Sequence, residues 1–559
     1  MTERIARGMA LYSVPGSRPA HHAASAWERR HRFRILAGVT LVALLLRVWA
    51  LDVSPPGLDA DEVSLGYNAY SLLHTGRDEY GQPWPLTFRA FGEYKRPAYV
   101  YAAIPGMALW GPTPVGVRVA AAVAGTLSVP AFYAVTALLL RSWRVALGAA
   151  ALLALSPWHL HFTRAAREAS LLVLAILLLA GALLRAWHTP AFRSCQGLGR
   201  ASFGGAGPWY VGAAVAFLLA VYSYPGGLLF APLLVLVLAG AYAGRVRRGP
   251  WRWMGAALGL AALGLVPLAE QFADGRAQAR LSQASIFNVP AVRQIASERV
   301  ARDRRDGAPW VLNVPTMVGL RQAVNAYLTH FDPAYLFTRG DPEPRHHSSD
   351  AGQLYLWDLP LLGAGLVRVA RGWRRPALRA IGAWLLIGPL PAAFAENAPH
   401  AVRSIVMLPA WYLVAATGLP PVWRWLRRRG YERDWLLLLA LSVAFYLYSF
   451  YRYYPIEHAK SWQSGMLEGY RAAQVEVDAG RFERVVIPQE LSASYIYALF
   501  GTAYDPQSYL SQGGSVVDPE GPFFPYPGPL RFRPFEVRVV DWGSEPRRPE
   551  VLYVLEASN

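Results

Sequence analysis

Long apolar stretches separated by polar connections run through most of the chain. A helix that crosses a membrane needs about 17 to 25 mostly apolar residues. Eleven stretches approach that length and composition, at residues 35–51, 115–140, 145–159, 169–187, 209–223, 226–243, 252–269, 354–370, 378–394, 402–420 and 434–451. The pattern predicts a mainly α-helical, polytopic membrane protein.

The polar connections between the apolar stretches differ in charge. Arginine is concentrated in the amino-terminal tail and in the short connections at 141–144, 185–207, 244–252, 368–379 and 424–434. Basic connections mark the cytoplasmic side of a membrane. We therefore expect a multi-pass protein of the cell inner (plasma) membrane, with its amino terminus in the cytoplasm and its carboxyl terminus outside.

This orientation divides the chain into three parts. Residues 1–34 form a basic cytoplasmic tail, and residues 35–451 form a transmembrane domain with outer loops at 52–114 and 270–353. Residues 452–559 are expected to form a small extracytoplasmic α/β domain. A helix-like run at 460–478 precedes strand-like runs at 484–488, 535–542 and 551–557, and a Pro/Gly-rich stretch at 517–534 predicts a loop.

Composition narrows the function further. Among 559 residues, 54% are hydrophobic and only 16% are charged, which is unusual for a soluble protein. The net charge of +18 is largely explained by the basic cytoplasmic connections. We expect these basic residues to contact anionic lipid headgroups of the bilayer, and we expect no nucleic-acid partner. A single cysteine, Cys195, excludes an intrachain disulfide and a cysteine metal cluster.

Candidate catalytic residues stand at the start of the first outer loop. Asp59, Asp61 and Glu62 lie just past a membrane span and lead into an amphipathic helix. Asp61 is a candidate helix cap, and Glu62 would then complement the helix dipole. The same carboxylates are also suited to act as a general base, with or without a divalent metal ion.

A cationic segment follows in the same loop. The chain has 53 arginines and only two lysines, so Lys95 beside Arg96 indicates a phosphate contact, although an ion pair with Glu93 is the alternative. Carboxylates and cations in one loop supply a base for a nucleophile and charges for a departing phosphate.

Further polar residues gather at the expected outer ends of later spans. Arg164 and Arg167 run against the charge rule and predict a lipid-phosphate contact, or an Arg164–Glu168 pair one helical turn apart. The other candidates are Tyr224, which lies in a tight turn and has a structural role as its alternative, and His346 and His347, which are weak metal ligands or members of a polar loop. His400 and Arg403 are candidate contacts to the donor, with helix capping as the alternative for Arg403.

The order of these motifs resembles a known family. Asp61-Glu62, Lys95-Arg96-Pro97, the run at 116–119, and Ser156-Pro157 followed by Arg164 and Arg167-Glu168 are similar to the bacterial branch of the protein O-mannosyltransferase and aminoarabinose transferase superfamily. These are integral-membrane GT-C glycosyltransferases. The resemblance covers about residues 50–200 and extends more weakly over about 330–420.

The resemblance implies an enzyme that transfers a sugar from a polyprenyl-phosphate donor to an acceptor hydroxyl on a protein, lipid or glycan, with inversion at the anomeric carbon. It implies that Asp61 is the general base, Glu62 its companion, and Lys95 a phosphate contact. Arg96 stands where the family has a proline. Glu93, an implied metal ligand, is displaced by one position because Tyr94 intervenes.

Two other functions compete with this interpretation. A flippase or transporter of lipid-linked sugars would carry charges inside its spans and show two related halves. The expected spans are nearly free of charge, and no internal duplication is evident. A scaffold for assembly or ligation, acting through residues 452–559, is the third hypothesis.

Overall fold

The helices of the bundle agree with the apolar pattern. The computed structural model describes residues 26–91, 93–189, 205–273, 286–348, 351–395, 397–489, 491, 493–515, 530–546 and 548–555. Each of the eleven expected spans coincides with a helix: α1 (Ala26–Val48), α4 (Pro114–Leu140), α5 (Trp143–Leu155), α7 (Glu168–His188), α8 (Gly207–Ser223), α9 (Pro225–Ala241), α11 (Trp251–Ala273), α15 (Leu359–Arg371), α16 (Pro376–Ile387), α18 (Leu408–Arg429) and α19 (Glu432–Tyr448). The mainly α-helical class is confirmed.

Helix length decides which of these could cross a membrane unaided. Within the described ranges, six helical stretches are long and apolar enough: Pro114–Leu140, Glu168–His188, Trp251–Ala273, Pro376–Ala393, Ile405–Arg429 and Glu432–Glu457. Three shorter apolar helices are α5, α8 and α9. The number of crossings and their orientation stay predictions.

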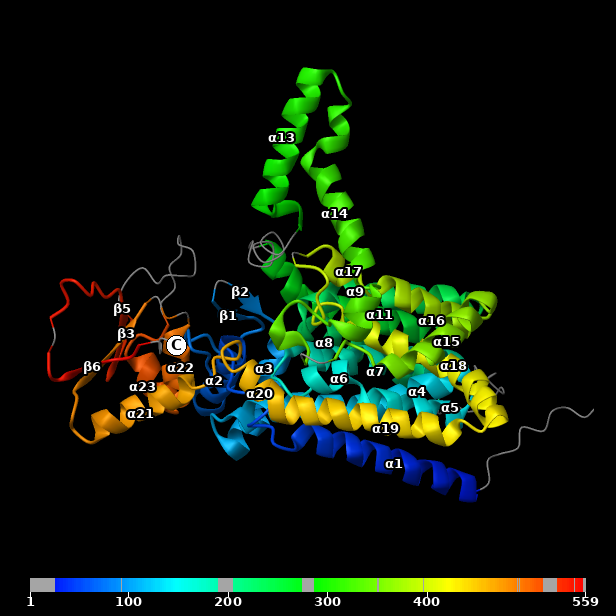
Figure 1. Ribbon diagram of the computed structural model, residues 1–559, viewed down its shortest axis with the longest axis horizontal. Helices are drawn as coiled ribbons and strands as arrows, with labels where there is room; N and C mark the ends of the chain where they lie inside the picture. Colours follow the sequence, from blue (N-terminus) through cyan, green and yellow to red (C-terminus); the bar gives the residue numbers. More distant parts are fainter. Residues whose placement is uncertain are drawn as a thin grey trace, which may run out of the picture.

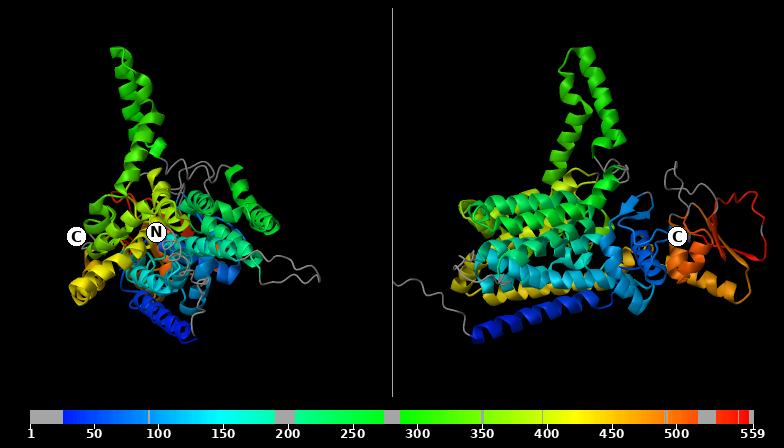
Figure 2. Two further views of the ribbon diagram at one scale, coloured as in Figure 1. Left: turned by 90° about the vertical axis from the view of Figure 1, so that its right-hand side faces the viewer. Right: turned by 180° about the vertical axis from the view of Figure 1, so that it is seen from behind.

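The bundle is elongated, and its helices run along the long axis of the molecule (Figure 1). The short α2 (Ala60–Thr75) and the carboxyl-terminal module lie at one end, and α1 begins near the other end (Figures 1 and 2). Short helices α6 (Pro157–Phe162), α10 (Ala243–Val246), α17 (Leu390–Ala393) and α20 (Tyr454–Glu457) connect the longer ones. The loops that the sequence predicts to be outside therefore share one end of the bundle.

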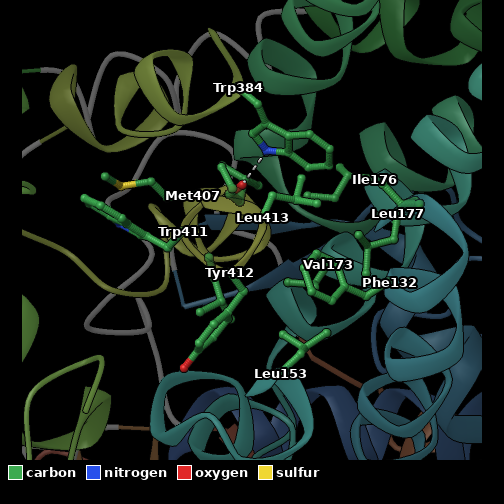
Figure 3. Packing of buried hydrophobic residues seen from close by; sticks show 14 of the residues in the cluster. Phe132, Leu153, Val173, Ile176, Leu177, Trp384, Met407, Trp411, Tyr412 and Leu413 are labelled. Carbon is green, nitrogen blue, oxygen red and sulfur yellow. Dashed lines mark hydrogen bonds between the residues drawn. The ribbon is translucent and has the colours of Figure 1, made fainter. Parts of the chain in front are cut away.

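A continuous apolar core joins α7 to α18. Val173, Ile176 and Leu177 of α7 lie fully buried near Leu413 of α18 (Figure 3). The indole nitrogen of Trp384 donates a hydrogen bond of 2.9 Å to the carbonyl of Val406. This contact satisfies the polar atom of a large buried side chain and ties α16 to the start of α18.

The first outer loop packs two helices and a small hairpin. Between α2 and α3 (Pro97–Trp110), strands β1 (Phe88–Ala90) and β2 (Glu93–Lys95) pair in antiparallel fashion. The hairpin brings Lys95 back toward the start of α2. The helix α3 corresponds to an apolar run that is too short to be a predicted span.

The carboxyl-terminal module is an α/β unit, as the sequence predicts. Its four strands, β4 (Leu530–Phe532), β5 (Phe535–Arg538), β3 (Arg484–Pro488) and β6 (Val551–Tyr553), are ordered β4-β5-β3-β6. Strand β3 pairs in parallel with β5 and with β6, and β4 is antiparallel to β5. Helix α21 (Met466–Asp478) lies within the predicted helical run. Strand β4 falls in the Pro/Gly-rich stretch, of which 517–529 lie outside the described residues.

Two short helices of this module are absent from the sequence prediction. They are α22 (Ser494–Gly501) and α23 (Pro506–Ser511), and both contact α2. A Cβ atom placed on Gly66 of α2 would lie 2.5 Å from the ring of Phe500 in α22, so a larger residue at this position would force the ring to move. The module and the first outer loop share one hydrophobic core.

The second long outer segment contains an unexpected feature. Helices α13 (Pro290–Asp306) and α14 (Pro315–Thr329) form a hairpin that projects sideways from the bundle (Figures 1 and 2). A 3₁₀ turn at Trp310–Asn313 joins them. The sequence predicts only an outer loop here.

Candidate functional site

Asp59 begins the site by fixing the start of α2. Its carboxylate accepts a hydrogen bond of 3.0 Å from the backbone N–H of Glu62 and so caps the helix. The same buried carboxylate pairs with Arg167 and, at 3.3 Å, with Arg345. The alternative that Asp61 caps α2 is therefore wrong, because Asp59 performs that role.

Asp61 is the carboxylate that remains accessible. Its side chain is 52% exposed and forms an ion pair of 2.8 Å with Nζ of Lys95. The ammonium also donates to the carbonyl of Asp61 at 3.2 Å. The charge of Lys95, aided by Arg167 at 3.6 Å, holds the pKa of Asp61 well below its usual range. Lys95 thus pairs with Asp61, whereas the side chain of Glu93 lies outside the described part of the chain.

Glu62 has a different environment from its neighbours. Its side chain is fully buried and accepts hydrogen bonds from Nε of Arg118 at 3.0 Å, from Nη2 of Arg118 at 2.8 Å, and from the backbone N–H of Ala166. Arg118 also donates to the carbonyls of Leu51, Pro55 and Gly57. The pair fastens α2 to α4 and to the end of the first span.

A cavity of about 700 Å³ opens beside Asp61. Eight residues expected from the sequence line it: Asp61, Lys95, Arg96, Arg167, Tyr224, His346, His400 and Arg403. They come from five separate segments of the chain that meet at one end of the bundle. Glu168, Asp341 and Glu343 line it as well, so the cavity contains four carboxylates, of which Asp61 is the most exposed, together with several cationic side chains.

Other expected residues lie behind the cavity wall. Glu62, Arg164 and His347 do not line it, and Asp59 lies beneath it in contact with Arg167. Arg164 is buried and donates to the carbonyls of residues at the end of the first span, Leu46, Ala50 and Ser54. The alternative Arg164–Glu168 pair is therefore wrong. Glu168 instead accepts from the backbone N–H of Arg96 at 3.0 Å.

Three side chains at the far wall can hold a metal ion. Asp341, His346 and His400 each offer one ligand atom, and these atoms lie within 4.8 Å of one another. Burial lowers the pKa of both histidines, which keeps the rings neutral and able to coordinate a metal. The predicted ligand His346 belongs to this group, and His347 does not.

Sequence reasoning missed two residues of the site. Arg345 lines the cavity and pairs with Asp59, and Asp341 accepts from Nδ1 of His346 at 3.2 Å. For Arg345, the available signal was an arginine in a segment that the positive-inside rule places on the outer side of the membrane. The same signal led to Arg164 and Arg167.

The carboxyl-terminal module contacts the segment that leads to Asp61. The hydroxyl of Tyr497 donates to the carbonyl of Leu58 at 2.9 Å and contacts Gln463. Gln463 accepts from the backbone N–H of Ala60 at 3.1 Å. The module thus binds the backbone on both sides of Asp59.

Trp462 adds an aromatic contact to this support. Its ring lies 5.7 Å from the guanidinium carbon of Arg118 and 5.3 Å from that of Arg167. A fully buried indole between two arginines stabilises their charge where water is excluded.

Comparisons with known proteins give structural likenesses only. No protein-family model matches the chain, and no curated protein matches it. The fold is similar to the oligosaccharyltransferase AglB from Archaeoglobus fulgidus, in complex with an inhibitory peptide and a dolichol-phosphate, at 15% identity and a TM-score of 0.48 over 86% of this chain. This chain spans 64% of the length of AglB.

A second similar structure is ArnT from Cupriavidus metallidurans bound to undecaprenyl phosphate. It matches 88% of this chain and 92% of its own length, at 15% identity and a TM-score of 0.46. AglB and ArnT are both GT-C glycosyltransferases.

Proposed function

We propose that this protein is a GT-C-type membrane glycosyltransferase that transfers a sugar from a polyprenyl-phosphate donor to an acceptor hydroxyl at the outer face of the membrane. One observation carries the proposal: Asp61, a half-exposed carboxylate, lines a cavity together with Lys95, Arg96, Arg167 and Arg403. A base and a set of cations in one cavity suit the transfer of a group away from a phosphate.

The reaction is a single displacement. The acceptor oxygen attacks the anomeric carbon, its proton passes to Asp61, and the bond between that carbon and the phosphate oxygen breaks. The departing polyprenyl phosphate keeps the electron pair, and Lys95 and Arg167 stabilise its charge. When the donor phosphate binds, Lys95 divides its charge between two anions, so the pKa of Asp61 rises toward the range of a useful base.

A divalent metal ion fits the far wall of the same cavity. Asp341, His346 and His400 would hold it, since two neutral imidazoles and one carboxylate form a common ligand set. Such an ion would supply additional positive charge for the phosphate. The protein's own residues bind the donor and accept the proton.

The decisive experiment measures transfer of a radiolabelled sugar in proteoliposomes supplied with polyprenyl-phosphate sugars. Loss of the base in Asp61→Asn is expected to reduce the transfer rate by about 10²- to 10⁴-fold while donor binding persists. Asp52→Asn is the matched control, because Asp52 is an exposed carboxylate of the same loop that does not line the cavity.

Two results would count against the proposal. Transfer that is unchanged in Asp61→Asn would remove the carboxylate from the mechanism. Movement of donor across the bilayer without transfer, equal in both proteins, would make the protein a flippase.

A further inference from the structure

The hairpin α13–α14 leaves the bundle close to the cavity. In both views from the side it projects across the direction of the bundle helices, and the view along the bundle shows it pointing outward (Figures 1 and 2). Because the bundle helices are those that cross the membrane, the hairpin runs along the membrane plane.

One face of α14 is apolar and exposed. Met317, Leu320, Val324 and Leu328 follow one another at spacings of three or four residues, so they lie on the same side of the helix. Their side chains are between 42% and 58% exposed. Within the described residues no other element covers this face, which would be unfavourable in water.

Helix α13 has the opposite character. Arg299, Arg302, Arg304 and Arg305 are all exposed along it. Figure 1 shows α13 on the side of the carboxyl-terminal module and α14 on the side of the bundle. Helix α13, which carries the arginines, therefore lies nearer the outer surface, and α14 lies nearer the depth of the bundle helices.

The tip of the hairpin combines exposed apolar side chains, as on α14, with an arginine of α13. Trp310, Val311 and Leu312 are exposed, and the guanidinium of Arg304 lies 4.5 Å from the centre of a Trp310 ring. Tryptophan and arginine are residues that favour the boundary between headgroups and hydrocarbon. An amphipathic element of this composition binds a membrane surface.

We infer that the hairpin α13–α14 lies in the outer leaflet of the bilayer, with its apolar face and tip among the acyl chains and the arginines of α13 at anionic headgroups. The hairpin also reaches the cavity: just after α14, Nε2 of His330 accepts a hydrogen bond of 3.1 Å from the backbone N–H of His400. Through this hydrogen bond, the position of the hairpin in the leaflet helps to hold the segment of His400 at the cavity. The inference rests on the membrane position of the bundle and not on sugar transfer.

Depth-dependent fluorescence quenching tests the position of the hairpin. In the full-length protein, Cys195 is replaced by serine, a new cysteine at Val324→Cys is labelled with an environment-sensitive dye, and the protein is reconstituted in vesicles of phosphatidylethanolamine and phosphatidylglycerol. The matched control is Val475→Cys, a valine with 60% exposure on α21 of the module. Leu320→Cys is a second site on the same face of α14, should Val324→Cys fold poorly.

The dye on α14 is expected to be quenched several-fold more strongly by spin-labelled lipid than the dye at position 475, and several-fold less by iodide in the water. Equal iodide quenching at both positions would show that the hairpin stands in water and would overturn the inference. Protection from both quenchers would also overturn it, because a protein surface would then cover α14.

Discussion

The buried pair of Glu62 and Arg118 makes a prediction that separates structural support from catalysis. Replacing Arg118 by methionine leaves the Glu62 carboxylate buried with only the backbone N–H of Ala166 as a donor. Replacing Glu62 by glutamine leaves Arg118 with three backbone carbonyls, those of Leu51, Pro55 and Gly57. The two halves of the pair therefore differ in how well they tolerate the loss of the partner.

The expected costs follow from this difference. Removing one partner of a buried ion pair lowers the free energy of unfolding by about 3–5 kcal/mol, and we expect Arg118→Met to fall in this range. In Glu62→Gln, the amide can still accept a hydrogen bond from Arg118, and Arg118 keeps its three carbonyl acceptors. The free energy of unfolding is therefore expected to fall by only about 1–3 kcal/mol. The double variant should cost less than the sum of the two, because neither charge is then left alone.

Equilibrium unfolding in mixed detergent micelles, followed by tryptophan fluorescence, measures these free energies. Arg481→Met is the control, since Arg481 pairs with Glu476 on the surface of the module with 59% of its side chain exposed. That change should leave the free energy of unfolding almost unchanged, because an ion pair between exposed side chains contributes little. The reasoning is refuted if Arg118→Met costs no more than Arg481→Met, or if Glu62→Gln proves the more harmful of the two.

Three further predictions concern single side chains. Lys95→Gln should weaken binding of a polyprenyl-phosphate sugar by about 1.5–3 kcal/mol, measured by titration calorimetry, and unchanged affinity would exclude Lys95 as a phosphate contact. Tyr497→Phe should lower the free energy of unfolding by about 0.5–1.5 kcal/mol and slow sugar transfer, because the hydrogen bond to Leu58 is lost; transfer at the original rate would show that the module does not position Asp61. Burial raises the pKa of Glu79 to about 7, so this carboxyl stays protonated in the folded chain while the unfolded chain ionises from about pH 4.5. Stability should consequently fall by about 3 kcal/mol as the pH rises from 4.5 to above 7, and a decline of equal size in Glu79→Gln would contradict this.

The sequence predicts the helices of the bundle because long apolar runs are a strong local signal. The strand β3 is also predicted at its residues, since its apolar run is short and bounded by polar positions. The hairpin α13–α14 is missed because α13 has few apolar positions and many charges. Helix α13 is stabilised by packing against α14, where Val292 and Ala296 contact Val318. A contact between two helices cannot be read from the sequence of one of them.

The sequence predicts which residues belong to the site better than it predicts which of them are buried and what they contact. Asp61, Lys95 and Arg167 are recognisable by residue type and by their place at the outer ends of spans. Whether a charged residue of this region is buried or open to the cavity depends on partners far away in the sequence. Glu62 is buried against Arg118, 56 positions later, and Arg164 is buried against backbone carbonyls more than 100 positions earlier. Contacts of this kind follow from the tertiary fold alone.

Of the three carboxylates at the start of α2, the fold leaves one open to the cavity. Successive side chains at a helix start point in different directions. Asp59 therefore meets Arg167 below the cavity, Glu62 meets Arg118 in the core, and only Asp61 reaches the open space. Because the two buried carboxylates fix the backbone on either side, Asp61 is held in place although its own side chain is half-exposed. As the proposed base, Asp61 would lose little conformational entropy when a hydroxyl binds, because its neighbours already hold it in place.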